Sequence, residues 1–348
     1  MVYKHRMEAQ DNNKNKITHG GDLTAATKEF GMPVRGWIDL STGINPVNFP
    51  DLKLKDQLFH KLPTSGQTTN LLKIASDFYQ VSTSMTIIAS PGTQAVLQHM
   101  PRLYPKRKVA ILSPTYSEYE NTWSRFGNEI IRAGNLQELK QGNIAVVVNP
   151  NNPDGRRHQI EDLIELAEHV ETLILDETFC DHSSEVSIIP KLHSQNIIVL
   201  RSIGKFFGLA GLRLGFVISN ANITDNIEKM LGPWAVSGPA IEIGTRALSD
   251  KPWIEKMDGI LSMKSRELDN LLIRQNLKIL GKTVLFKLIE NNNAQFIYQT
   301  LAKSGILVRK FNGQKNWLRI GLPGIKSEWL RLEAILHDCS NAINDMSK

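Results

Sequence analysis

Three side chains that could react with or bind a ligand follow one apolar run. The run Ile197–Leu200 is typical of a buried parallel strand, and Ser202, Lys205 and Arg213 come after it. A lysine at the mouth of a buried strand loses contact with water, which makes its amine nucleophilic near neutral pH. Such an amine forms a Schiff base with an aldehyde, whereas a hydroxyl and a guanidinium bind phosphate. The segment therefore indicates a pyridoxal phosphate (PLP) site; a solvated lysine in a glycine-rich loop is the alternative.

Other apolar runs also end in polar residues. In open α/β sheets, ligands bind at the carboxyl ends of the strands. Complementary polar groups at four successive strand ends predict one shared site. These groups are Tyr116 after Val109–Leu112, Asn152 after Ile144–Val148, Asp176 after Leu173–Leu175, and Ser202 with Lys205 after Ile197–Leu200.

Two further runs extend this pattern. The run Ile87–Ala89 leads into Gly92, Thr93 and Gln94 at the start of an expected helix. Backbone N–H groups and the helix dipole at such a position attract anions, although an ordinary strand-to-helix turn has the same sequence. The run Phe216–Ile218 follows Arg213 after a short connection, which predicts an antiparallel strand.

Composition narrows the class of protein. The chain has 348 residues, 41% of them hydrophobic and 22% charged, which suits one large domain or a large and a small one. No apolar run approaches the ~18 residues of a membrane span, and the polar start of the chain does not look like a secretory signal. Two cysteines suit a reducing cytoplasm. The net charge of +6 comes from scattered residues, so we expect no nucleic-acid partner and a ligand carrying phosphate or carboxylate. No metal site is predicted.

The chain also contains longer blocks of motif. They read HGGD, DLSTGINP, SPGTQAVLQHMPRL, SPTYSEY, VVNPNNPDGR, VLRSIGKFFGLAGLRLGF and LGPWAVSGPA, and they span His19 to Ala240. Their order and spacing resemble the fold-type I PLP enzymes, the aspartate aminotransferase superfamily. Within it, the blocks look like the threonine-phosphate decarboxylases of cobalamin biosynthesis, with histidinol-phosphate aminotransferases as near relatives that share the catalytic core.

The resemblance implies an α/β fold with a mostly parallel sheet in a large domain and a smaller α+β domain. We expect a mobile polar tail over 1–18, an N-terminal segment over 19–44 that packs with the small domain, the large PLP-binding domain over 45–244 and the small domain over 245–348. Periodicity predicts helices over Leu23–Phe30, Lys53–His60, Leu71–Tyr79, Trp253–Gln275 and Lys326–Met346.

The resemblance also implies roles for individual residues. Lys205 would bind PLP and move protons, Asp176 would pair with the pyridine nitrogen, and Asn152 would donate to the ring's phenolate oxygen. The remaining residues divide into two groups. The cofactor-binding residues would be Gly92, Thr93, Gln94, Tyr116, Asn152, Asp176, Ser202, Lys205 and Arg213; the substrate-binding residues would be His19, Gly20, Gly43, Asn152, Arg309 and Arg319.

The implied reaction is decarboxylation of O-phospho-L-threonine to (R)-1-aminopropan-2-yl phosphate and CO2, in a cytoplasmic homodimer. An aminotransferase acting on histidinol phosphate or a similar phosphorylated amine is the alternative. A non-catalytic binding protein with this fold is disfavoured, because Lys205, Asp176 and Asn152 are all present. The chain departs from its relatives at Phe179, where many aminotransferases have tyrosine, and at Leu62, where some decarboxylases have a tyrosine that reaches the partner's cofactor.

Overall fold

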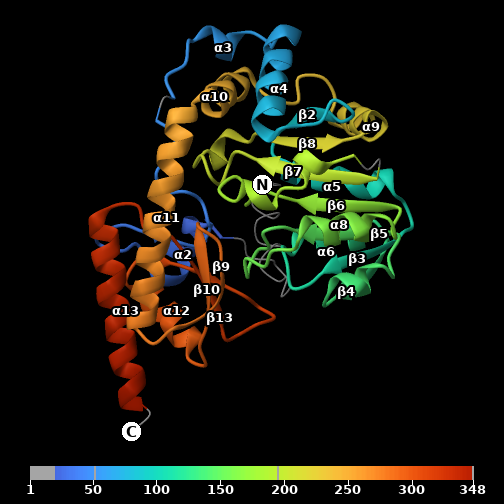
Figure 1. Cartoon of the computed structure of the whole chain (residues 1–348). Coiled ribbons are helices and arrows are strands. Elements are labelled where there is room, and N and C mark those ends of the chain that lie inside the picture. Colours follow the sequence, from blue (N-terminus) through green and yellow to red (C-terminus); the bar gives the residue numbers. More distant parts are fainter. Residues whose placement is uncertain (1–19, 51, 194–195, 347–348) are drawn as a thin grey trace, which may run out of the picture.

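A twisted seven-stranded sheet forms the centre of the larger part of the chain (Figure 1). The computed structural model describes residues 20–50, 52–193 and 196–346. The strand order is β2-β8-β7-β6-β5-β3-β4, and β8 runs antiparallel to both of its neighbours while the remaining pairs are parallel. The strands are β2 (Thr86–Ser90), β3 (Lys108–Leu112), β4 (Glu129–Ala133), β5 (Ile144–Val148), β6 (Thr172–Asp176), β7 (Ile197–Ser202) and β8 (Gly215–Ser219).

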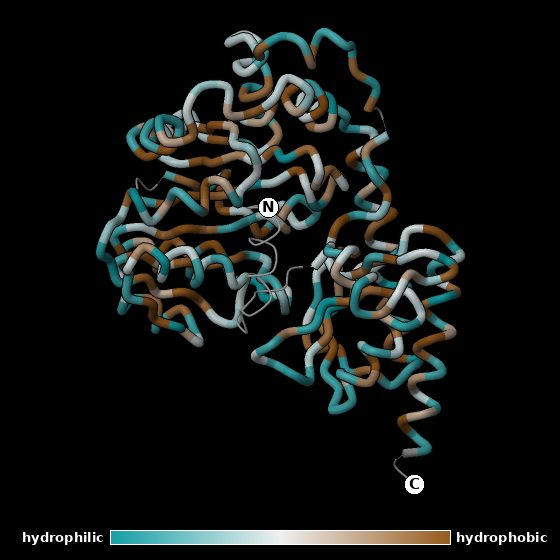
Figure 2. Tube along the Cα trace, turned by 180° about the vertical axis from the view of Figure 1, so that it is seen from behind, coloured by the Kyte–Doolittle hydropathy of each residue, from teal (hydrophilic) through white to brown (hydrophobic). Residues whose placement is uncertain are grey.

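Helices cover both faces of this sheet because successive strand residues point to opposite sides. In β5, for example, Val146 belongs to the core on one face and Val147 to the core on the other. The face of Val146 is covered by α5 (Thr93–Leu103), α6 (Glu118–Arg125) and α9 (Ala221–Leu231). The face of Val147 is covered by α4 (Ser65–Tyr79), α7 (Leu136–Leu139), α8 (Ile160–Ala167) and α10 (Gly238–Ser249). Figure 2 shows the hydrophobic stretches gathered in the sheet and the hydrophilic ones toward the outside.

The smaller part is an α+β unit. Its antiparallel sheet has the order β12-β13-β10-β9, formed by β9 (Lys278–Lys282), β10 (Phe286–Glu290), β12 (Arg309–Lys310) and β13 (Trp317–Gly321). The long helix α11 (Lys251–Arg274) runs beside both parts in Figure 1. The other helices of this part are α2 (Leu23–Phe30), α12 (Ala294–Lys303) and α13 (Lys326–Met346). The N-terminal strand β1 (Ile38–Asp39) pairs in parallel with β11 (Ile306–Leu307).

The α/β class with a mostly parallel sheet and a smaller α+β unit is confirmed, as is the antiparallel direction of β8. Helix α3 (Gln57–His60) is shorter than the expected 53–60. Strands β4 and β9 were not expected. The domain boundaries stay predictions, and the expected tail over 1–18 lies outside the described residues. Within the part of the chain that the structure describes, no helix is both long and apolar enough to cross a membrane.

Candidate active site

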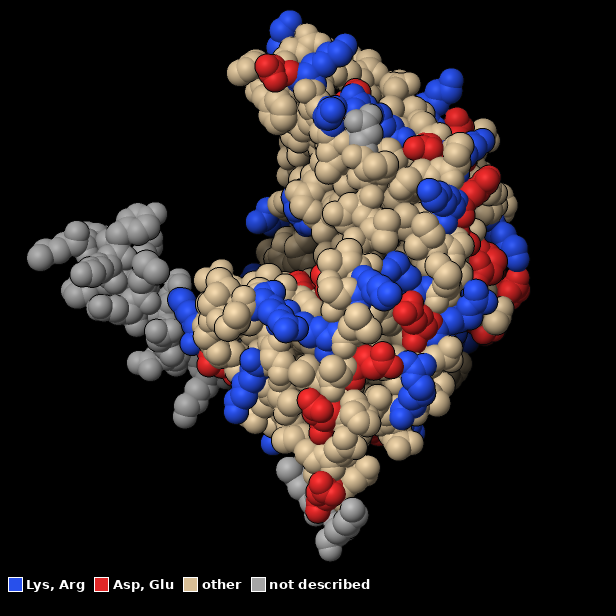
Figure 3. All heavy atoms as spheres, turned by 90° about the vertical axis from the view of Figure 1, so that its left-hand side faces the viewer, with Lys and Arg blue, Asp and Glu red and all other residues tan. Residues whose placement is uncertain are grey.

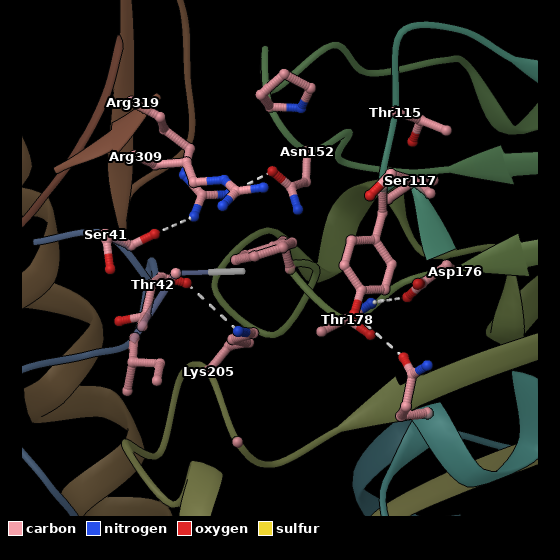
Figure 4. A pocket seen from close by; sticks show the side chains of 18 of the residues that line it. Ser41, Thr42, Thr115, Ser117, Asn152, Asp176, Thr178, Lys205, Arg309 and Arg319 are labelled. Atoms are coloured by element: carbon pink, nitrogen blue, oxygen red, sulfur yellow. Dashed lines mark hydrogen bonds between the residues drawn. The ribbon is translucent and has the colours of Figure 1, made fainter. Parts of the chain in front are cut away.

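A cavity of about 590 Å³ opens at the carboxyl ends of the parallel strands (Figure 4). Loops after β2, β3, β5, β6 and β7 supply one wall, and β12, β13 and the loop after β1 supply the other. Its volume lies in the range typical of small-molecule sites. Its lining includes Gly20, Thr42, Gly92, Thr93, Gln94, Tyr116, Asn152, Asp176, Thr178, Ser202, Lys205, Arg213, Arg309 and Arg319.

Lys205 projects into this cavity from the loop after β7. Its Nζ donates a hydrogen bond to the backbone oxygen of Thr42 at 3.4 Å and lies 5.4 Å from the centre of the Phe179 ring. Burial of the amine and the positive charge of Arg319 lower the pKa of Lys205 to about 8, against the opposing effect of Asp176. The amine is therefore far more reactive near neutral pH than an exposed lysine.

Asp176, the last residue of β6, is held by two donors. Its Oδ2 accepts from the hydroxyl of Tyr119 at 2.9 Å, and its Oδ1 accepts from the backbone N–H of Thr178 at 2.9 Å. A carboxylate has about four acceptor positions, so these bonds leave room for a further donor. The carboxylate is 7% exposed and lines the cavity. It is placed to bind a protonated ring nitrogen.

One end of the cavity carries groups that can bind an anion. Gly92 caps the N-terminus of α5 with φ 79° and ψ 157°, a conformation that favours glycine. A Cβ at this position would lie 2.5 Å from Nη2 of Arg213, so the guanidinium packs directly against the glycine. Thr93 follows Gly92, and Ser202 lines the same cavity. Helix N–H groups, two hydroxyls and a guanidinium together form an anion site.

Tyr116, in the loop after β3, lines the same cavity as Asp176 and Thr178. Its hydroxyl donates to Oε1 of Gln94 at 3.1 Å, and Nε2 of Gln94 donates to Glu118 at 3.2 Å. Burial raises the pKa of Tyr116 to about 12, so its phenol stays protonated. The side chain of Gln94 thus orients the tyrosine ring, which can stack on an aromatic ligand.

The opposite wall carries two arginines. Arg309 on β12 pairs directly with Arg319 on β13. Arg319 donates from Nη1 to Oδ1 of Asn152 and from Nη2 to the backbone oxygen of Ser41 at 2.6 Å. Burial and the nearby charge of Arg309 lower the pKa of Arg319 to about 9, and burial lowers that of Arg309. Two positive charges on directly paired residues favour the binding of an anion beside them.

An aromatic pair packs beside the cavity, and one of its two rings, Phe179, lines it. Phe179 packs edge-on against Phe286, with ring centres 5.2 Å apart. Gly43, with φ 63°, lets Phe286 approach, because a Cβ there would lie 2.9 Å from the Phe286 ring. Gly43 is not among the residues that line the cavity, although Thr42 and Ile44 are. The position of Gly43 therefore indicates a role in packing against Phe286 more directly than the predicted contact with substrate.

The structure brings together most of the predicted residues. Gly20 and all of the predicted cofactor-binding residues line this one cavity, together with Arg309 and Arg319. His19 lies outside the described residues. Sequence reasoning missed Tyr119 and Thr178, which hold Asp176. The outer surface has no comparable grouping on the face seen in Figure 3, where basic and acidic side chains of the described residues are intermixed.

Known proteins are similar to this chain in sequence. The aminotransferase class I and II family model matches residues 35–332. The chain belongs to this family. It is 38% identical over 313 residues to a threonine-phosphate decarboxylase of Sinorhizobium sp, covering 88% of this chain and 93% of the relative. It is 33% identical over 327 residues to one of Pseudomonas aeruginosa, covering 92% and 97%.

Solved structures agree on the fold. A histidinol-phosphate aminotransferase from Sinorhizobium meliloti, in complex with pyridoxal-5'-phosphate, has a TM-score of 0.82 at 17% identity and covers 97% of this chain and 100% of that chain. A threonine-phosphate decarboxylase from Porphyromonas gingivalis has a TM-score of 0.72 at 19% identity, covering 86% and 98%. The fold-type I assignment is confirmed.

The residues of the cavity fit PLP, the cofactor of this family. Because position 92 is a glycine, the guanidinium of Arg213 has room beside the N-terminus of α5. In addition, the buried hydroxyl of Thr178 and Nε of Arg319 have no hydrogen-bond partner among the described residues, so both can bind a ligand. Lys205 would bind the aldehyde, Asp176 the ring nitrogen and Arg213 the phosphate. PLP requires a reactive amine, an anion site and a carboxylate, and this cavity contains all three.

Proposed function

We propose that the protein is a PLP-dependent decarboxylase that converts O-phospho-L-threonine to (R)-1-aminopropan-2-yl phosphate and CO2. The observation that carries the proposal is a pair of arginines, Arg309 and Arg319, which are cross-strand neighbours on the wall of the cavity opposite the loop of Lys205. The substrate has two anionic groups, a carboxylate and a phosphate, and one arginine can bind each. The names of the two relatives that are 38% and 33% identical over 88% and 92% of this chain support the same reaction.

Arg319 is the group we assign to the substrate carboxylate. Its Nη atoms already donate to Asn152 and Ser41, so the guanidinium cannot rotate. Its Nε is buried without a partner among the described residues and therefore remains available as a donor. Arg309 is the group we assign to the substrate phosphate, together with Gly20 and with His19, which lies outside the described residues.

The residues around Lys205 have separate roles in the proposed reaction. PLP, when bound, supplies an electron sink for the pair released when a bond at Cα breaks. Asp176 keeps that sink effective by holding a proton on the ring nitrogen, and Tyr119 holds Asp176 in place. Asn152 orients the ring through its amide, whose oxygen accepts from Arg319.

The reaction needs a proton donor, and we assign this role to Lys205. Loss of CO2 breaks the bond between Cα and the carboxylate carbon, and one proton must be added to Cα. Nζ of Lys205 is the group placed to deliver it, because its lowered pKa allows it to hold and release a proton near neutral pH. The neighbouring ring of Phe179, 5.4 Å from Nζ, excludes water from one side of the amine.

The experiment is a comparison of two reactions. Protein loaded with PLP is given O-phospho-L-threonine, and released CO2 is measured. The same protein is given histidinol phosphate with 2-oxoglutarate, and glutamate is measured. Release of CO2 without amino transfer supports the proposal; glutamate formation without CO2 would refute it.

The second reaction corresponds to a second candidate, an aminotransferase acting on histidinol phosphate or a similar phosphorylated amine. A relative named histidinol-phosphate aminotransferase from Clostridium novyi is 31% identical over 275 residues. The same arginine pair would bind its phosphate. The reactions differ in which bond at Cα lies perpendicular to the cofactor ring, and that angle is set by how Arg319 holds the substrate.

We further propose that the protein acts as a cytoplasmic homodimer. Phe59, Leu62 and Trp234 are 65%, 63% and 60% exposed. The segments that carry them lie close together, because a Cβ at Gly238, four residues after Trp234, would lie 2.9 Å from the backbone oxygen of Leu58. A second copy that covers these apolar side chains would remove them from water. Light scattering of the purified protein tests the dimer, and a mass of one chain would refute it.

A further inference from the structure

Thr178 is a threonine of the cavity wall whose hydroxyl finds no hydrogen-bond partner within residues 20–50, 52–193 and 196–346. The residue is 9% exposed, and its Oγ1 is buried without a hydrogen-bond partner among the residues that the structure describes. Its backbone N–H donates to Oδ1 of Asp176 at 2.9 Å, which fixes the threonine beside that carboxylate. Buried hydroxyls in proteins are almost always paired, so this one calls for a partner.

A second threonine of the same cavity provides the contrast. Thr115 donates from Oγ1 to Oδ1 of Asn151 at 2.6 Å, so its hydroxyl is used within the protein. Both threonines follow the carboxyl ends of parallel strands of one sheet, Thr115 after β3 and Thr178 after β6, and β5 lies between these two strands. The unpaired hydroxyl of Thr178 is therefore a property of that position and not of the cavity as a whole.

The location of Thr178 identifies which bound molecule it would contact. In the view of Figure 4 it stands between Lys205 and Asp176, whereas Arg309 and Arg319 lie on the far side of the cavity. A molecule held by Lys205 at one end and by Asp176 at the other must pass Thr178. A carboxylate or phosphate held by the arginines need not reach it.

We propose that the hydroxyl of Thr178 forms a hydrogen bond with bound PLP, and that this bond compensates for the donor that Phe179 lacks. The inference rests on PLP being the cofactor, and concerns the residue that binds it. Thr178 is a binding residue here, since it contacts the cofactor directly. Without PLP the hydroxyl is a buried polar group that destabilises the protein; with PLP it contributes to affinity.

The test uses the full chain with and without PLP. Thr178→Val keeps the shape of the side chain and removes the hydroxyl, and Thr178→Ser keeps the hydroxyl. We expect Thr178→Val to weaken PLP binding about 3- to 10-fold, as one hydrogen bond would, measured by fluorescence titration of the ligand-free protein. Its melting temperature without PLP should be unchanged or higher. Thr178→Ser should bind PLP within about 2-fold of the original protein.

The control variant is Thr115→Val, which should lower the melting temperature without PLP because Asn151 loses its donor. Three results would overturn the proposal. The first is PLP affinity unchanged in Thr178→Val with weaker binding of O-phospho-L-threonine, which would make the hydroxyl a substrate contact. The second is a lower melting temperature of ligand-free Thr178→Val with unchanged PLP affinity, which would make its role structural. The third is failure of the original protein to bind PLP, which would refute the proposed function as well.

Discussion

The hydroxyl of Tyr119 donates to Oδ2 of Asp176 at 2.9 Å, beneath the cavity and out of contact with water. Tyr119 belongs to α6 and Asp176 to β6, so the bond joins a covering helix to the end of a central strand. Burial and the adjacent Asp176 charge raise the pKa of Tyr119 well above its ordinary value. The phenol therefore keeps its proton and always acts as the donor.

Replacing this tyrosine tests its role. Tyr119→Phe leaves one oxygen of a buried carboxylate without its protein donor, which costs about 1–3 kcal/mol. We expect a lower free energy of unfolding for the ligand-free protein and weaker binding of PLP, measured by urea unfolding and by titration. Tyr104→Phe, which removes a phenol at the end of α5, is the control and should leave PLP affinity unchanged. Equal PLP affinity in all three proteins would contradict the role of Tyr119.

The lowered pKa of Lys205 predicts how PLP uptake depends on pH. With a pKa of about 8, roughly a tenth of the amine is neutral at pH 7. The rate of covalent capture of PLP should therefore rise with pH, with a midpoint near 8, and then level off. Arg319→Met removes the positive charge that lowers this pKa, so its midpoint should shift upward. Lys191→Met, on the surface, should not shift it.

The same pKa has a consequence for stability. The folded value lies below the ordinary value of lysine, so between about pH 8 and 10.5 the unfolded chain binds more protons than the folded one. The free energy of unfolding of the ligand-free protein should receive a rising contribution across this window, absent from Lys205→Met. Urea unfolding at pH 7 and pH 10 measures the difference between the two proteins. A difference that does not change with pH would show that Lys205 is protonated like an exposed lysine.

Gly92→Ala tests the phosphate end of the cavity. The added Cβ would lie 2.5 Å from Nη2 of Arg213 and displace the guanidinium. We expect PLP affinity to fall at least about 10-fold, since a charge-assisted bond is lost. Gly232→Ala is a matched control, because its φ of 77° and ψ of 175° are similar and a Cβ there meets nothing within 4 Å. If both variants bind PLP equally, backbone strain and not the contact with Arg213 explains any loss.

Arg309→Ala separates substrate from cofactor. Loss of one arginine–phosphate contact should raise the KM for O-phospho-L-threonine about 10- to 100-fold, while PLP affinity changes little. Lys315→Ala, in the exposed loop between β12 and β13, is the control and should leave both values unchanged. Similar losses of PLP and substrate affinity in Arg309→Ala would argue against its binding the substrate phosphate.

The sequence was most informative where its signals were local. Apolar runs followed by Asn152, Asp176 and Lys205 located three strand ends, because buried parallel strands have few polar residues until they emerge. The edge strand β4 was missed because its exposed residues, Glu129 and Arg132, interrupt the apolar pattern. Helix α4 begins earlier than expected, at a capping box of Thr64 and Gln67 that the sequence does contain.

The residues that hold the site were harder to predict. Tyr119 lies 57 positions before Asp176, and nothing in its neighbourhood indicates that α6 packs against the end of β6. Thr178 was visible beside Asp176, but only its surroundings reveal that its hydroxyl is unpaired. Such contacts depend on tertiary packing, which periodicity does not specify.

The bond from Arg319 to Asn152 crosses between the two sheets, with one partner on β13 and the other after β5. Grafting the C-terminal unit of a relative onto this chain would therefore replace the guanidinium while keeping the amide it immobilises. If Arg319 binds the substrate carboxylate as proposed, a chimera of that kind would inherit substrate preference and cofactor alignment as a single trait, because the same side chain also holds Asn152.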